Sequence, residues 1–248
     1  MSKLVPSEKY PTILKISEPN FSNQNAASQV IIQVLNRSIK DQMLIELLSA
    51  IIEQPFYEDL RTKQQLGYIV SSGVKASEET RTLSLIVQSS VVPSGKITKE
   101  ILKFLDYFKQ KELEPLSEMK FNSFIKGMID RKTEPDKRLA TEATRNWAQI
   151  SNEKYQFDRV QKEVSALLSM TKEDLLEFWN LNVARSNDNG VRLLISEIVP
   201  QTGPASSEQP RKDVKDTSTN SGFVLGIDNI EGFRINARSL EYSNILNR

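Results

Sequence analysis

The sequence predicts an α+β fold in which several helices pack on a largely antiparallel sheet. Residues 68–74 and 81–88 read as the two strands of an antiparallel hairpin, because Leu83, Leu85 and Val87 fall on one face at period two and residues 75–80 are polar enough for the connecting turn. Residues 98–180 repeat apolar side chains at helical spacing, and residues 191–199 return to strand character. This order of strand, helix, hairpin, helices and strand indicates a layer of helices on a sheet.

The elements before the hairpin are two strands and a helix. Residues 12–16 and 30–35 are short, β-branched and apolar, and a turn-rich stretch separates them. Residues 39–52 carry apolar side chains every three to four positions, so this helix has one face that suits a sheet. Pro55 lacks a backbone donor, and we expect the helix to kink or restart there and to continue over residues 56–65.

Gly67 follows this second helical stretch, and its conformational freedom suits the exit from a helix. Apolar periodicity predicts later helices over residues 138–150, 158–168 and 172–183. Thr171 precedes the last of them with Asp174 three positions on, which is close to a capping box. We interpret Trp147 and Trp179 as residues that pack between helices.

The chain is expected to form one domain over residues 1–248. A chain of this length buries roughly 70–75% of its unfolded surface, which is enough for stability without disulfides or a structural metal. Residues 201–221 contain few apolar side chains and predict a long flexible loop. Residues 223–227 form a short apolar run that suits one more strand.

The composition excludes many kinds of chemistry. The chain contains no His and no Cys, so it cannot build an imidazole or thiolate metal site, a Ser-His-Asp triad or a Cys nucleophile. The 33 Lys and Arg against 32 Asp and Glu leave a net charge of +1, which argues against nucleic acid as a partner. No apolar run reaches the length of a membrane span. A chain without Cys is compatible with the cytoplasm, the location we expect.

One segment, residues 60–70, carries a candidate site. Arg61 lies in the last helical turns and Tyr68 opens the hairpin, so a reversal at Gly67 would bring both side chains to the same edge. Arg and Tyr are hydrogen-bond donors suited to a carbonyl or an oxyanion. The spacing equally allows a structural role, in which Arg61 pairs with a carboxylate such as Glu58 and Tyr68 packs on its ring.

The surroundings of this pair are similar to a family signature. The stretches that carry the likeness are Glu53-Gln54-Pro55-Phe56, Leu60-Arg61-Thr62-Lys63 and Gln65-Leu66-Gly67-Tyr68-Ile69-Val70. Further on, Phe157-Asp158-Arg159 and Thr171-Lys172-Glu173-Asp174 lie at matching separations. These motifs resemble the C-terminal half of the insulinases, the insulysin group of pitrilysin-type zinc metallopeptidases, and the likeness runs from about residue 30 to residue 199.

The resemblance implies a domain of a larger enzyme. Insulinases consist of four similar αβ domains in two halves that close around peptide substrates, and this sequence looks like the fourth domain alone. It is then an αβ sandwich of the insulinase and mitochondrial processing peptidase type, a fragment of a zinc metalloendopeptidase that is inactive alone. The expected partners are the N-terminal catalytic half of the parent and peptide substrates, and a homodimer of the parent stays open.

The resemblance also locates the metal elsewhere. In this family, zinc is held by an H-x-x-E-H helix and a distal Glu in the first domain. At the matching place, residues 42–48 contain one carboxylate, Glu46, and no imidazole. Zinc is therefore expected in the parent enzyme and not in this chain, and we interpret Glu46 as an ordinary helix carboxylate.

By the same resemblance, Arg61 and Tyr68 match an Arg and a Tyr that reach across the closed chamber to the scissile bond. They would bind substrate and stabilise the transition state as auxiliary catalytic residues. Gln64 stands where the family leads us to expect Glu, and Ser71 replaces an expected aromatic. The competing hypothesis is a paralogue that kept the fold, lost the enzyme and serves as a scaffold or regulatory module.

Overall fold

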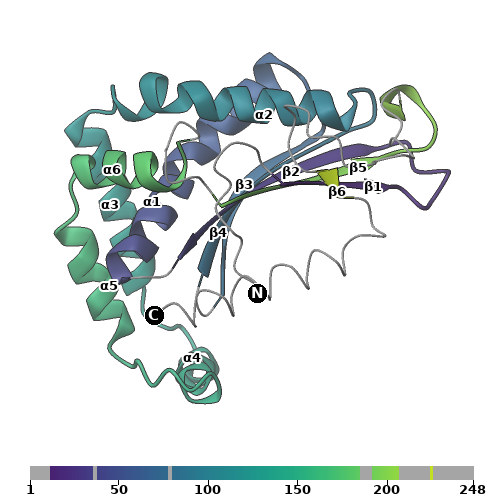
Figure 1. Ribbon diagram of the computed structural model, residues 1–248. Coiled ribbons are helices and arrows are strands. Elements are labelled where there is room, and N and C mark those ends of the chain that lie inside the picture. The colour runs from purple at the N-terminus through teal and green to yellow at the C-terminus, as the bar shows by residue number, and fades with distance from the viewer. Residues whose placement is uncertain (1–11, 36–37, 78–79, 185–191, 207–223, 226–248) are drawn as a thin grey trace, which may run out of the picture.

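The computed structural model describes residues 12–35, 38–77, 80–184, 192–206 and 224–225. In these residues, helices cover a twisted six-stranded sheet (Figure 1). The prediction of an α+β fold is therefore confirmed.

The sheet has the strand order β3-β4-β2-β5-β1-β6. The three pairings from β3 to β5 are antiparallel, whereas β1 pairs in parallel with β5 and with β6. The sheet is thus largely antiparallel as expected, and β3 forms one edge within the described residues. The strands are β1 (Thr12–Ser17), β2 (Ala26–Leu35), β3 (Ile69–Ala76), β4 (Thr80–Ser89), β5 (Leu193–Val199) and β6 (Val224–Leu225).

Six α-helices and three shorter helical segments are described. The α-helices are α1 (Ile39–Tyr57), α2 (Ser94–Phe108), α3 (Glu118–Thr133), α4 (Leu139–Ser151), α5 (Arg159–Leu168) and α6 (Lys172–Asn182). Two π-helical turns extend α1 and α2, namely η1 (Glu58–Lys63) and η2 (Lys109–Leu113), and η3 (Pro204–Ser206) is a 3₁₀ turn. The predicted later helices and the final short strand therefore agree with the structure within a few residues.

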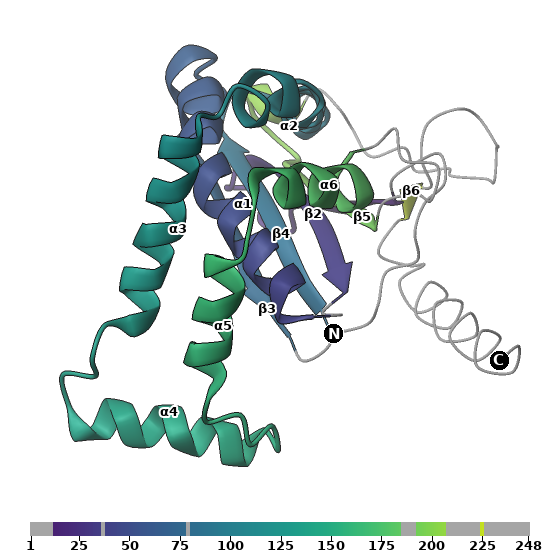
Figure 2. The ribbon, with the colours of Figure 1, turned by 90° about the vertical axis from the view of Figure 1, so that its left-hand side faces the viewer.

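The helices form a layer on one face of the sheet. α1 and α2 contact the strands, and α3, α5 and α6 pack on α1 (Figures 1 and 2). The core between them is apolar and includes Met43 and Leu47 of α1 with Val30 and Leu85 of the sheet, all fully buried. Burial of such side chains contributes about 1.5–3 kcal/mol each. α1 is therefore fixed against the sheet.

The expectation that the helix restarts at Pro55 is wrong, because α1 runs unbroken from Ile39 to Tyr57. α1 contains Pro55 in its last turn and passes directly into η1. Ile51, Ile52 and Phe56 around the proline are buried in the core. Tertiary burial of this face outweighs the lost backbone hydrogen bond, so the helical run continues.

The capping prediction at α6 is confirmed, because Thr171 and Asp174 form a complete capping box. Trp179 is buried as expected, but the prediction that Trp147 packs between helices is wrong, since it is 64% exposed. Trp147 belongs to α4, which lies across the far ends of α3 and α5 and has no buried residue (Figure 2).

The predicted loop over residues 201–221 is described only in its first part. Residues 201–206 bend back on the protein, with Ala205 fully buried, while residues 207–221 lie outside the described residues. Gln201 and Thr202 donate to the carbonyls of Glu18 and Phe21. Within the described ranges, no helix combines the length and apolarity needed to cross a bilayer.

Candidate functional site

The candidate site is built on the reversal between η1 and β3. The Gln64 N–H donates to the Asp59 carbonyl and the Leu66 N–H to the Leu60 carbonyl, both at 2.9 Å. Leu60 and Leu66 are buried and anchor the two sides of the turn. Gln65 has φ +53°, a left-handed conformation that reverses the chain. The π-helical hydrogen-bond pattern of η1 is of a kind often found at functional sites.

Gly67 is needed for a different reason from the one predicted. Gln65, and not Gly67, makes the left-handed exit from the helix. A Cβ atom on Gly67 would lie 1.9 Å from the backbone oxygen of Gln88 in β4. Because Gly67 has no side chain, the chain can enter the sheet against β4. This close approach fixes the position of Tyr68, the next residue.

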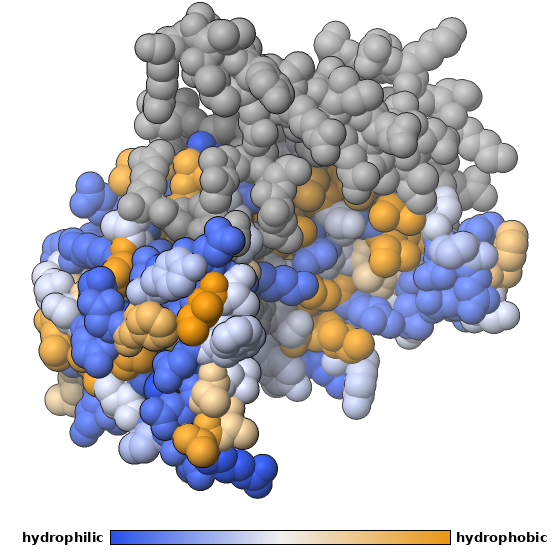
Figure 3. All heavy atoms as spheres, turned by 90° about the horizontal axis from the view of Figure 1, so that it is seen from below, coloured by the Kyte–Doolittle hydropathy of each residue, from blue (hydrophilic) through white to orange (hydrophobic). Residues whose placement is uncertain are grey.

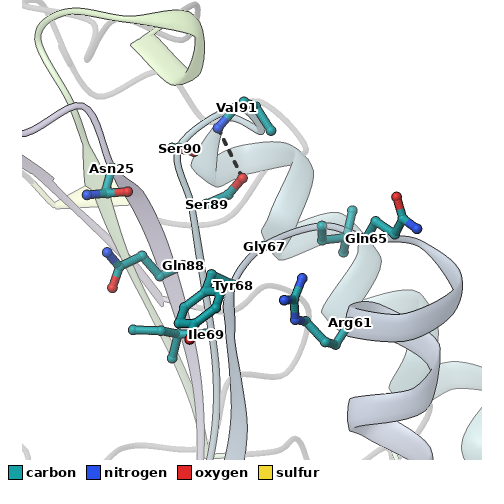
Figure 4. A pocket seen from close by; sticks show the side chains of 11 residues that line it. Asn25, Arg61, Gln65, Gly67, Tyr68, Ile69, Gln88, Ser89, Ser90 and Val91 are labelled. Atoms are coloured by element: carbon teal, nitrogen blue, oxygen red, sulfur yellow. Dashed lines mark hydrogen bonds between the residues drawn. The ribbon is translucent and has the colours of Figure 1, made fainter.

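Arg61 and Tyr68 meet at this reversal. The Arg61 guanidinium carbon lies 5.2 Å from the centre of the Tyr68 ring, a cation–π contact (Figure 4). The expectation that both side chains project to one edge is confirmed. Tyr68 is 84% exposed, so most of its side chain faces solvent. Glu58, the alternative partner considered for Arg61, accepts instead from the Gln54 amide at 2.7 Å.

The pair borders an open pocket of about 320 Å³ at the start of β3 (Figure 4). The other lining groups are uncharged, so Arg61 supplies the charge of the lining. Gln88, Ser89 and Val91 of β4 and the following turn complete the wall. Such a pocket offers a cation, a phenol and amide and hydroxyl groups to a bound carbonyl or oxyanion.

Sequence reasoning missed the β4 side of this pocket. Gln88 is opposite Ile69 in the antiparallel register, which places it beside Tyr68. The hairpin was evident in the sequence, but its register depends on contacts such as the hydrogen bond from the Ser77 N–H to the Thr80 carbonyl and the close approach of Gly67 to β4. Knowledge of that register would have identified Gln88.

A second cavity of about 510 Å³ lies between α1 and the edge strand β3. Ser71, which stands in place of an expected aromatic, borders it together with Tyr57. The small side chain of Ser71 therefore borders open space beside the site.

The α1 helix does not offer a zinc site. The two carboxylate oxygens of Glu46 pair with Arg81 at 3.1 Å and with Lys132 at 2.9 Å. Gln42, one turn earlier, accepts from Arg81 at 2.8 Å. Among the described residues there is no group of three or more acidic, His or Cys side chains placed to hold a metal ion. Because cations already occupy both oxygens of Glu46, these residues do not fit zinc.

A family model and two curated proteins are similar to this chain over overlapping parts of its length. Residues 47–147 match the family model described as PQQ synthase PqqF-like, C-terminal lobe domain 4. The chain is 32% identical to human insulin-degrading enzyme over 160 residues, which is 64% of this chain and 16% of that protein. It is 33% identical to human nardilysin over 169 residues, or 67% of this chain and 15% of that protein.

The fold is also that of a solved peptidase. The crystal structure of pitrilysin superposes with a TM-score of 0.68 at 17% identity, covering 90% of this chain and 22% of that one. The chain thus spans about a fifth or less of the length of these relatives. The matched part includes the segment with Arg61 and Tyr68. The chain therefore belongs to the pitrilysin and insulin-degrading-enzyme-like M16 peptidase family, as a domain of the C-terminal lobe.

Proposed function

We propose that this chain is the non-catalytic C-terminal domain of an insulysin-like zinc metalloendopeptidase and forms part of the closed chamber in which peptides are degraded. The N-terminal half of the parent would hold the zinc, which supplies Lewis-acid polarisation of the scissile carbonyl. The family relationship and the unsuitability of Glu46 for zinc support this division of roles. The absence of Cys is compatible with a cytoplasmic parent, which is part of the proposal.

The stacked pair of Arg61 and Tyr68 is the observation that carries the proposal. The Tyr68 hydroxyl donates to the oxyanion of the tetrahedral intermediate, and Arg61 holds a substrate carbonyl by charge-assisted bonds. Neither group needs an adjacent base for this role. The exposure of Tyr68 leaves its hydroxyl free to reach a substrate presented from the other half of the enzyme.

The test is zinc-dependent peptide cleavage by the assembled parent enzyme with Tyr68→Phe or Arg61→Ala. Removal of one oxyanion donor is expected to lower kcat about 10²–10³-fold. Tyr155→Phe, at a 61% exposed residue between α4 and α5, is the matched control. Circular dichroism checks that each variant folds, and full activity of folded Tyr68→Phe would refute the assigned role.

A scaffold or regulatory module is the second candidate, and the exposed apolar side chains of α4 favour it. Leu139 and Trp147 are 82% and 64% exposed. Under this hypothesis, Arg61→Ala leaves partner binding unchanged, whereas Leu139→Asp weakens it. A parent gene that encodes an H-x-x-E-H helix upstream would instead support the peptidase role.

A further inference from the structure

The turn that carries Arg61 is tied to the neighbouring helix by a polar cluster outside the pocket. Asp59, at the start of η1, accepts from the Tyr107 hydroxyl of α2 through its Oδ2 atom. The same oxygen accepts from the Gln64 side-chain amide at 2.9 Å. One carboxylate thus joins the beginning of η1, its end and α2.

The residues of this cluster are themselves held in place. The Tyr107 ring packs edge-on to Phe104, with 5.6 Å between ring centres, and Lys111 lies 4.3 Å above its face. Burial, together with the hydrogen bond to Asp59, raises the pKa of Tyr107, so its hydroxyl stays protonated and continues to donate. The Tyr107 hydroxyl therefore remains a hydrogen-bond donor over the physiological pH range.

Gln64 supplies the second side-chain donor of this cluster. It stands where the family resemblance leads us to expect Glu. An amide donates to the Asp59 carboxylate, whereas an ionised Glu at position 64 would repel it. The amide at position 64 thus complements the carboxylate at position 59.

The geometry points to a positioning role: we propose that the cluster of Asp59, Gln64 and Tyr107 holds the η1 turn so that Arg61 stacks on Tyr68. Asp59 precedes Arg61 by two residues and therefore faces α2 from the side of the helical turn opposite to the guanidinium. Leu60, between them in the sequence, is fully buried in the core. The catalytic consequence of this positioning rests on the proposed function, but the positioning itself does not.

The first test uses the chain alone and reads the Arg61–Tyr68 stack directly. The Arg61 Nε–H resonance is expected to carry an upfield ring-current shift, and Tyr68→Leu defines its value without the ring. Tyr107→Phe and Gln64→Glu should each lose most of this shift at pH 7. Tyr155→Phe and Gln156→Glu, between α4 and α5, should keep it. An unchanged shift in both cluster variants overturns the inference.

The pH dependence of Gln64→Glu adds a signature that general destabilisation would not produce. A protonated Glu donates as an amide does, so the shift should return as the pH is lowered towards about 5. Lys111, Glu100 and Glu112 also act on Tyr107 from α2 and η2, and Glu58 and Lys63 lie on η1 itself. These groups are present in both the Gln64→Glu variant and the wild type. A difference between the pH dependences of the two proteins therefore comes from residue 64. A shift that stays lost at low pH contradicts the inference.

The second test separates this inference from the proposed function. In the assembled parent enzyme, both cluster variants should lower kcat between about 10- and 100-fold with little change in KM, since a small misplacement of a catalytic group has effects of this size. Loss of the stack with unchanged kcat would support the positioning role and refute the proposed role of Arg61 and Tyr68. Retention of the stack refutes the positioning role whatever the kinetics show.

Discussion

At the scale of single residues, the site depends on a glycine that is needed for close packing. Gly67 approaches the Gln88 carbonyl so closely that no Cβ atom fits. The residue next to it, Tyr68, contributes to the pocket, so this contact links strand packing to the position of a proposed functional group. A Cβ atom on Gly73, in the middle of β3, would instead meet no other atom within 4 Å.

We predict that Gly67→Ala lowers the free energy of unfolding by about 2–4 kcal/mol, because the new methyl group must push β3 away from β4. Gly73→Ala should change it by no more than about 0.5–1 kcal/mol. Urea unfolding of the chain measures both. Equal effects of the two substitutions would contradict the close approach at Gly67.

At the scale of elements, an ion-pair network joins the helix layer to the sheet. Glu163 of α5 pairs with Lys132 of α3 at 2.9 Å and with Arg159 at 2.7 Å. Lys132 in turn pairs with Glu46 of α1, which contacts Arg81 of β4. Such buried pairs are costly to break one partner at a time, since the remaining charges are then uncompensated.

The pKa of Glu163 sets the pH range of this network. Burial on its own would raise the pKa, but the hydrogen bonds from Arg159 and Lys132 outweigh it, and the pKa lies below its ordinary value of 4.5. A carboxylate with a lowered pKa stabilises the fold fully above that ordinary value. The stabilisation is lost as the pH falls through the lower value of the folded state.

Glu163→Gln is therefore expected to cost about 3 kcal/mol at pH 7. The difference from the wild type should shrink as the pH falls below 4.5 and through the lowered pKa of Glu163, where the carboxylate of the folded protein itself becomes protonated. Denaturant unfolding at a series of pH values measures this, with the exposed Glu142→Gln on α4 as control. A difference that is constant with pH would show that Glu163 is not charged in the folded protein.

At the scale of the whole molecule, the helix layer is asymmetric. Most helices bury an apolar face on the sheet or on α1, whereas α4 buries none. The described surface seen from below shows apolar patches scattered among hydrophilic side chains (Figure 3). The two tryptophans of the chain lie at the two extremes of burial, with Trp179 2% and Trp147 64% exposed.

This difference predicts two classes of fluorescence in the chain. Acrylamide should quench the emission of Trp147 efficiently and that of Trp179 weakly. Trp147→Phe should leave a protein of nearly unchanged stability whose remaining emission resists quenching, because an exposed side chain contributes little to folding. Strong quenching of the single remaining Trp179 would show that the core around α6 is open.

The sequence by itself determined the fold class, most elements and the segment with Arg61 and Tyr68. Periodicity reports which face of a helix or strand is apolar, and this information is local. The missing His and Cys likewise excluded whole classes of chemistry without any structure.

Only the tertiary structure decided the contacts made across the fold. It showed that the helix continues through Pro55, that Gln65 rather than Gly67 reverses the chain, and that Trp147 is exposed. It also brought Tyr107 to Asp59, 48 positions away in the chain. The burial around Pro55 and the contact of Tyr107 with Asp59 depend on packing between residues distant in sequence, whose energies outweigh the local preferences that a sequence pattern expresses.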